Sequence, residues 1–324
     1  MTVDMHDTEA SGVDVIVRFH DPNRFEELRA ALLCLIGQSY RPLRVVLVTQ
    51  RFPKAALAEL ECRLRPYRQI DPSLAFEVVP YERTEGLPDA RAALINAGIA
   101  AARGRYLAVL DYDDTLYPHA YAVLVNELRA SGAVLAFGGI ALKSVTMDTS
   151  VPLGLAFARL PRAPGGGLVD TFRNAFCPVH GMLLDRLRIA PEDLCVDEGL
   201  PIYEDYEWHL RLGTRYPISY AALDQVIGDY RFKGDGSNTV LLRGSKDAER
   251  QALWEHYAAR IEQRRKTLPI EPAVQARLGI EPPRPGLTIR GLLDLLDAGE
   301  LSLRPAPRLV LRTPAYRSQD LSYY

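Results

Sequence analysis

The sequence predicts an α/β fold, in which a doubly wound, mostly parallel sheet is flanked by helices and followed by a C-terminal helical extension. Three observations predict it. Short apolar runs alternate with segments of helical periodicity from Val13 onward, one apolar run ends in a cluster of carboxylates, and the pattern becomes helical and Pro-rich after about Lys246. In open α/β sheets, ligands bind beyond the carboxyl ends of the strands. The acidic strand end is therefore also the first place to look for a functional site.

The first third of the chain contains four apolar runs typical of strands buried on both faces. These expected strands span 13–19, 44–50, 74–79 and 107–110. Helices are expected between them, over 23–37, 53–64 and 88–103. Asn23 and Glu26 resemble a capping box, and Gly104 suits a helix C-terminus. Successive βα units of this kind form right-handed crossovers and a doubly wound sheet.

The next segment continues the alternation less regularly. A helix over 118–130 and a strand over 133–143 are expected, then strands over 176–184 and 226–232, with a helix beginning near Glu204. Residues 147–167 are rich in Pro and Gly and end in Gly165-Gly-Gly167. They lack the Lys of a phosphate loop. Two interpretations stay open for this stretch, a flexible surface connection and a mobile flap over an acceptor site.

Three carboxylates, Asp111, Asp113 and Asp114, follow the fourth expected strand. Alternating carboxylates repel one another, so the cluster is expected to hold a divalent cation and, through it, a phosphorylated ligand. The plainer alternative is a hydrated acidic turn before the next helix. The segment around Asp111 also resembles the first motif of haloacid-dehalogenase-like phosphatases, in which Asp111 would be a nucleophile. Loosely spaced candidates for the remaining motifs of that family are Lys143, Asp229 and Asp235.

A wider set of motifs resembles family 2 glycosyltransferases of the GT-A fold. Their order along the chain carries the resemblance: Gln38-Ser-Tyr-Arg-Pro42, Asn96-Ala-Gly98, Gly104-Arg-Tyr106, Asp111-Tyr-Asp113, Pro118, Glu204-Asp205, Leu210-Arg-Leu212, and Tyr230-Arg231 before Ser237-Asn238. A non-catalytic relative that binds sugar nucleotides remains a further alternative.

The resemblance implies a role for each matching residue. Asp111 and Asp113 would hold Mn or Mg, and with Asp114 they would bind a nucleoside-diphosphate sugar. Asp205, beside Glu204, would be the base that deprotonates a hydroxyl acceptor during an inverting displacement. Gln50, Arg91 and Lys233 are further donor-binding candidates, and Lys233 stands where many relatives have a His. His180 and Gly181 are candidates for acceptor contacts.

The resemblance also divides the chain. It predicts a tail over 1–12, a nucleotide-sugar-binding half over 13–114, an acceptor-binding half of the same domain over 115–240, and a helical extension over 241–324. The acceptor substrate that the resemblance implies would be a glycan, a lipid-linked saccharide or a small molecule.

Composition limits the other partners. A net charge of -2, from 39 basic and 41 acidic residues, argues against nucleic acid as a partner. The four cysteines show neither a zinc-binding spacing nor a disulfide framework, and no apolar run is long enough to span a membrane. A cytoplasmic protein is expected, and an oligomer is possible. Arg264-Arg-Lys266, on an amphipathic helix, leaves two options: docking onto the main domain and peripheral contact with an anionic membrane.

Overall fold

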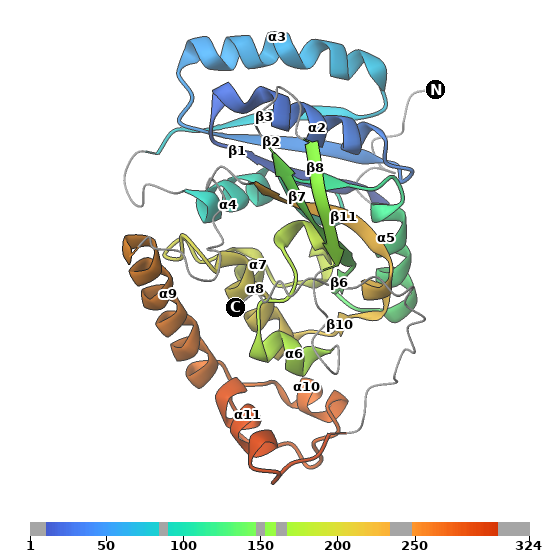
Figure 1. Ribbon diagram of the computed structural model, residues 1–324. Helices are drawn as coiled ribbons and strands as arrows, with labels where there is room; N and C mark the ends of the chain where they lie inside the picture. Colours follow the sequence, from blue (N-terminus) through green and yellow to red (C-terminus); the bar gives the residue numbers. More distant parts are fainter. Residues whose placement is uncertain (1–10, 84–89, 147–152, 160–166, 234–247, 304–324) are drawn as a thin grey trace.

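A computed structural model describes residues 11–83, 90–146, 153–159, 167–233 and 248–303 (Figure 1). Most of the expected 1–12 tail, most of the 147–167 segment, and the Ser237-Asn238 and Asp235 positions lie outside the described residues. None of the helices in the described ranges is long and apolar enough to cross a membrane.

A seven-stranded sheet forms the centre of the protein. Its strands run in the order β10-β6-β9-β4-β1-β2-β3. Their bounds are β1 (Val13–Phe19), β2 (Leu43–Gln50), β3 (Ala75–Tyr81), β4 (Tyr106–Asp111), β6 (Leu135–Phe137), β9 (Met182–Asp185) and β10 (Ile218–Ser219). The four N-terminal strands are mutually parallel, and only β9 runs antiparallel to its neighbours β4 and β6. The expected doubly wound, mostly parallel sheet is confirmed.

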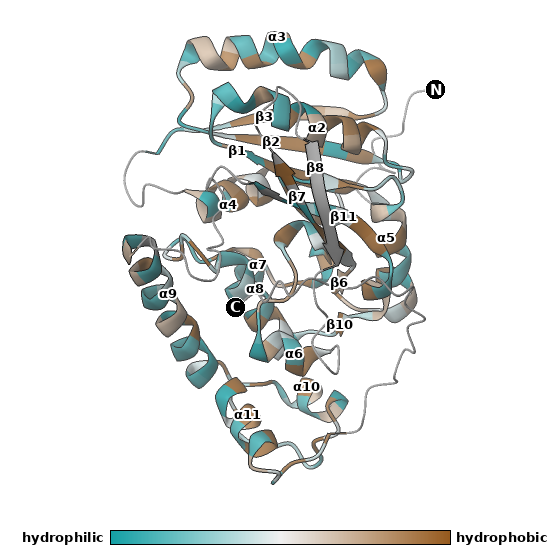
Figure 2. Ribbon diagram, viewed as in Figure 1, coloured by the Kyte–Doolittle hydropathy of each residue, from teal (hydrophilic) through white to brown (hydrophobic). Residues whose placement is uncertain are grey.

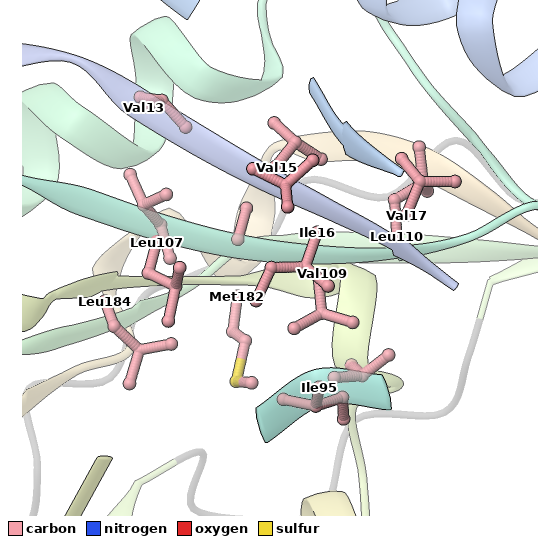
Figure 3. Close-up of a cluster of buried hydrophobic side chains, with 14 of the residues drawn as sticks. Val13, Val15, Ile16, Val17, Ile95, Leu107, Val109, Leu110, Met182 and Leu184 are labelled. Carbon is pink, nitrogen blue, oxygen red and sulfur yellow. The ribbon is translucent and has the colours of Figure 1, made fainter. Parts of the chain in front are cut away.

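Helices cover the sheet because its strands are apolar on both faces. These are α2 (Phe25–Ile36), α3 (Lys54–Ile70), α4 (Arg91–Ala101) and α5 (Ala120–Ser131). Figure 3 shows part of the resulting core, where side chains of β1 and β4 meet Ile95 of α4 and Met182 of β9. Gly98 lets α4 approach β1 closely, since a Cβ there would lie 2.5 Å from Cγ2 of Ile16.

Two expected details at the first helices are wrong. The Asn23–Glu26 capping box does not form, because Asp21 instead caps a short 3-10 turn, η1 (Pro22–Arg24), and α2 begins after it without a side-chain cap. Helix α3 continues through Pro66 to Ile70, well past the expected end at Leu64. Tyr67, in this added turn, packs against the main core, which explains why the helix persists.

A second, four-stranded sheet was not expected. It has the order β5-β11-β7-β8, with β5 (Thr115–Leu116), β7 (Gly139–Thr146), β8 (Leu153–Arg159) and β11 (Val226–Lys233). The expected strand over 133–143 is wrong as one strand, because the chain leaves the first sheet at Gly138 and enters the second. A Cβ at Gly138 would lie 2.5 Å from the side chain of Ile227, so a glycine allows this close crossing. The expected 176–184 strand begins instead as a 3-10 turn, η2 (Val179–Gly181), before β9.

The C-terminal helices pack on the side of the domain that carries α6 (Leu168–Arg173) and α8 (Glu204–Arg215) (Figure 1). They are α9 (Ala248–Thr267), α10 (Pro272–Arg277) and α11 (Ile289–Asp297). The remaining short elements are η3 (Arg186–Arg188), α7 (Pro191–Leu194) and η4 (Ala221–Asp224). A second apolar core joins α6 and α8 to these C-terminal helices through residues such as Phe172, Leu210, Ile261 and Leu292.

Helix α9 is largely hydrophilic along its visible length (Figure 2). Its apolar residues Tyr257 and Ile261 are buried in the second core, so the docking interpretation is confirmed. Arg264 pairs with Asp197 at 2.7 Å, and Arg265 donates to the hydroxyl of Tyr206 at 2.7 Å. Because these two arginines face the main domain, they give no support to the alternative of contact with a membrane.

Candidate active site

The acidic strand end is organised around a buried arginine. Strands β1 and β4 pair in a register that sets Arg18 beside Asp111. Nε of Arg18 donates to Oδ1 of Asp111 at 2.6 Å, and Nη2 donates to Oδ2 at 2.7 Å. The remaining Nη1 donates to Oε1 of Glu204 at 2.8 Å. One guanidinium therefore joins the ends of two central strands to the start of α8.

Glu204 and Asp205 open α8, where carboxylates are stabilised by the helix dipole. Glu204 is buried in its pair with Arg18, whereas Asp205 is only partly buried and its Oδ1 accepts from the backbone N–H of Tyr206 at 2.7 Å. Burial, together with the adjacent charge of Glu204, raises the pKa of Asp205 to about 7 despite the opposing charge of Arg18. A carboxylate with such a pKa accepts a proton near neutral pH far more readily than an ordinary aspartate.

Asp113 has a different cationic partner. Nζ of Lys233, at the end of β11, lies 2.6 Å from Oδ2 of Asp113 and 2.9 Å from Oε2 of Glu27 on α2. The Lys233 side chain is only 2% exposed, while that of Asp113 is 26% exposed. Although burial opposes it, the pKa of Lys233 is raised by Asp113 and Glu27. Lys233 is therefore the buried ion-pair partner of Asp113. This role differs from the expected direct contact with a diphosphate.

Asp114 points into the protein, so its expected contact with a donor is not supported. Its Oδ1 accepts from the backbone N–H of Arg231 at 2.8 Å, and its Oδ2 lies 3.2 Å from Nδ1 of His180. Burial raises the pKa of Asp114 although His180 opposes it, and the charge of Asp114 in turn outweighs burial and raises the pKa of His180.

The expected acceptor contacts of His180 and Gly181 are not supported either, because both residues are buried. The His180 side chain has no exposed surface. Gly181 is also buried, and a Cβ there would lie 2.5 Å from Sγ of Cys177. Neither residue is accessible to an acceptor, and His180 instead holds Asp114 in place.

Two further candidates lie at the same edge of the sheet. Gln50 is the last residue of β2, which runs parallel to β1 and therefore ends at the same edge. Arg91 is the first residue of α4. Burial opposes ionisation of Asp111, but the charges of Arg18 and Arg91 outweigh it and lower the pKa of Asp111. The site thus gathers cations and carboxylates from several separate elements.

A divalent cation fits part of this arrangement. Among the residues that the structure describes, no group of three or more His, Cys, Asp and Glu side chains could hold a metal ion by itself. Magnesium-like cations are commonly held by one or two carboxylates, with water and substrate phosphates completing the coordination. Asp113, partly exposed at the strand tip, suits such a site. Asp111 suits it less well, because Arg18 bonds both of its oxygens.

Sequence reasoning missed the two residues that hold the carboxylates in place, Arg18 and Glu27. The signal for Arg18 was present, since a charged residue near the end of an otherwise apolar buried strand needs a buried partner. Glu27 gave no comparable signal, because an acidic residue in the first turn of a helix is ordinary.

Comparison with known proteins gives the following matches. The family model described as "Glycosyl transferase family 2" matches residues 15–186, more than half of the chain. The "Succinoglycan biosynthesis protein ExoO" of Rhizobium meliloti (strain 1021) is 30% identical over 145 aligned residues, and the match covers 42% of this chain and 39% of that protein. The match therefore spans well under half of that relative's length.

Solved structures give more distant matches. The mannosyltransferase PcManGT from Pyrobaculum calidifontis, in complex with GDP-Man and Mn2+, is 16% identical with a TM-score of 0.49, over 90% of this chain and 80% of that one. S. aureus TarS 1-349, in complex with UDP, is 14% identical with a TM-score of 0.48, over 68% of this chain and 60% of that one.

Proposed function

We propose, since this chain belongs to glycosyl transferase family 2, that it transfers a sugar from a nucleoside-diphosphate sugar to a hydroxyl acceptor with inversion at the anomeric carbon. The observation that carries the proposal is the link through Arg18. It ties Asp111, at the tip of a central strand, to Glu204 in the acidic first turn of α8. Asp205, a carboxylate with a pKa of about 7, is the next residue. One side chain thus links an acidic strand end to the residue that precedes the candidate base.

Asp205 is the proposed base. In a single displacement, it takes the proton of the acceptor hydroxyl as that oxygen attacks the anomeric carbon, and the nucleoside diphosphate leaves from the opposite face. A pKa of about 7 suits this step, because the group is ionised near neutral pH and still basic enough to accept the proton. Glu204 is not free for this role, since it is buried against Arg18.

On the donor side, the proposed work is the binding and neutralisation of a diphosphate. Asp113 is the proposed protein ligand for Mn or Mg, and the bound cation would supply Lewis-acid stabilisation of the leaving group. Arg91 is proposed to contact the diphosphate or the base. Gln50 is proposed to contact the base, because its amide offers both a donor and an acceptor. Arg18 orients Asp111, and Lys233 orients Asp113.

The acceptor is proposed to be a saccharide, because the chain is similar to ExoO, which is named a succinoglycan biosynthesis protein. A cytoplasmic location and self-association are proposed as well. The phosphatase alternative is not retained, because both oxygens of Asp111, its required nucleophile, bond to Arg18, and the chain belongs to a different family.

The test measures release of nucleoside diphosphate from a panel of nucleoside-diphosphate sugars, with saccharide acceptors and Mn, by wild type and by Asp205→Asn. We expect at least one donor to be consumed by wild type. We expect Asp205→Asn to transfer about 10²-fold more slowly or worse, because the amide keeps the shape but accepts no proton. Equal rates would refute the role of Asp205, and no donor turnover by wild type would favour a non-catalytic, sugar-nucleotide-binding protein.

A further inference from the structure

The segment 195–203, which leads directly into Glu204 and Asp205, is held from two sides. On one side, Asn96 of α4 forms a reciprocal pair with the backbone of Val196. The Asn96 side chain accepts from Val196 N–H at 2.8 Å and donates to its carbonyl at 3.0 Å. Asn96 also donates to Oε1 of Glu198 at 2.9 Å. These contacts attach the segment to the half of the domain that carries Asp111.

On the other side, helix α9 holds the same segment with its arginines. Arg260 donates to the carbonyl of Gly199 at 2.6 Å. One turn further along, Arg264 pairs with Asp197 at 2.7 Å. Arg265 reaches past the segment to the hydroxyl of Tyr206, the residue after Asp205, at 2.7 Å. Three arginines of one helix thus bind both the segment and the first turn of α8.

The last residue of the segment, Tyr203, has an unusual backbone conformation. Its φ of 64° and ψ of 14° lie in the left-handed region, which is unfavourable for a residue with a Cβ. Such a conformation persists only where the surroundings impose it. The ring of Trp254, on α9, packs edge-to-face against the Tyr203 ring, with centroids 4.8 Å apart. Tyr203 is the N-cap of α8, so its conformation sets the direction in which Glu204 and Asp205 enter the helix.

We propose that α9 is a positioning element for sugar transfer, in which Trp254 holds Tyr203 in its left-handed conformation and Arg260, Arg264 and Arg265 fix the surrounding backbone, so that Asp205 is aimed at the acceptor hydroxyl. This inference rests on the proposed function. Trp254 and Tyr203 act through the backbone of the catalytic pair and are positioning residues. The C-terminal extension is then part of the transfer machinery.

The sharpest test compares two small residues at position 203. Glycine adopts the left-handed conformation without support, whereas alanine does not. Tyr203→Gly should keep kcat within about threefold of wild type, while Tyr203→Ala should lower it at least about tenfold, since small misplacements of a reacting group have large effects on rate. The KM for the donor should stay the same in both. If the Tyr203 ring contacts the acceptor, both variants will lose activity alike, and the proposal is wrong.

Trp254 provides the second arm. Trp254→Ala should lower kcat at least about tenfold with an unchanged donor KM, and Trp254→Phe, which keeps an aromatic ring, should restore most of it. The neighbouring Leu253, which is 46% exposed, gives the matched control Leu253→Ala, expected at wild-type kcat. If Trp254→Ala does not fold, Arg264→Met takes its place, compared with Lys266→Met at an exposed position of the same helix. Wild-type kcat in either test variant overturns the proposal.

Hydrogen exchange separates this inference from the proposed function, because it needs no turnover. In Trp254→Ala or Arg264→Met, amides over 196–207 should exchange faster, while those of β1 and β4 should keep their wild-type rates. Protection that stays unchanged over 196–207 contradicts the positioning role, whether or not the wild type transfers sugar. If exchange over 196–207 is faster in these variants while the wild type turns over no donor, the proposed function is refuted and the structural link stands.

Discussion

At the scale of single residues, the site is defined by carboxylates whose charge is held in place at a cost. Arg18 pairs with both Asp111 and Glu204, and Lys233 pairs with Asp113. Asp205 lies next to this network, and in the contacts described no cation bonds to its own oxygens. The consequence is visible in the pKa of Asp205, which burial and Glu204 raise to about 7. An ionised Asp205 is therefore useful for proton transfer and unfavourable for folding.

This trade-off predicts a pH-dependent gain in stability for Asp205→Asn. The folded-state pKa of Asp205, about 7, exceeds the value of 3.8 expected in the unfolded chain. The folded protein thus binds the proton more tightly, and the contribution of Asp205 to stability falls as pH rises from about 4 to about 7. Asparagine stays neutral, so the Tm of Asp205→Asn should exceed that of wild type by a few degrees at neutral pH.

Thermal unfolding across this pH range checks the prediction. The difference in Tm between Asp205→Asn and wild type should widen from about pH 4 to about pH 7 and stay constant above it. Glu300→Gln, which changes an exposed carboxylate, is the control and should show no such widening. A variant less stable than wild type at neutral pH would mean that Asp205 is not held at a raised pKa.

At the scale of elements, Arg18 is the point where β1, β4 and α8 are joined. Replacing it with Met leaves two carboxylates without their cation, and breaking a buried ion pair from one side typically lowers the free energy of unfolding by about 3–5 kcal/mol. Arg63→Met is the control, because Arg63 pairs with Glu59 on the exposed surface of α3. That pair should contribute about 0.5 kcal/mol or less.

Urea denaturation measures both variants. A fall in the midpoint at constant slope reports lost stability of the folded state. If Arg18→Met loses no more than Arg63→Met, the two carboxylates find other partners, and the joining role of Arg18 is wrong.

The contact between α4 and β1 gives a second prediction at this scale. Gly98→Ala places a methyl group 2.5 Å from Cγ2 of Ile16, so the helix or the Ile16 side chain must shift, and overpacking of this kind costs about 1–3 kcal/mol. The reverse is expected for Gly291→Ala in α11, where the nearest atom to the new Cβ is 3.4 Å away. Alanine should stabilise that helix by roughly 0.5–1 kcal/mol. In denaturant unfolding, Gly98→Ala should lower the free energy of unfolding and Gly291→Ala should raise it. A rise in both variants would refute the close approach at Gly98.

At the scale of the whole molecule, the sequence predicted those features that depend on local patterns along the chain. Mostly apolar runs such as Val13–Phe19 identified the parallel strands, and the order of motifs indicated the family. The second sheet was missed because its pairing joins residues far apart in sequence, and the departure at Gly138 depends on the side chain of Ile227.

Two site predictions, the donor contact of Asp114 and the acceptor contact of His180, are unsupported for a related reason. His180 and Asp114 looked like contacts because they lie near motif residues, yet the fold turns both inward. Sequence proximity to a motif does not determine which way a side chain faces. The pairing of Lys233 with Glu27 likewise depends on tertiary contact between β11 and α2.

The central claim is that the strand-tip carboxylates bind a sugar nucleotide, and calorimetry tests it most directly. The nucleoside-diphosphate sugar panel is titrated into wild type and Asp113→Ala, each with and without Mn. Asp113→Ala should fold normally, because Glu27 still pairs with Lys233. We predict that wild type binds at least one donor more tightly with Mn, by about tenfold or more, and that Asp113→Ala loses this gain. Failure of every donor to bind wild type, or the same gain with Mn in Asp113→Ala, would contradict the claim.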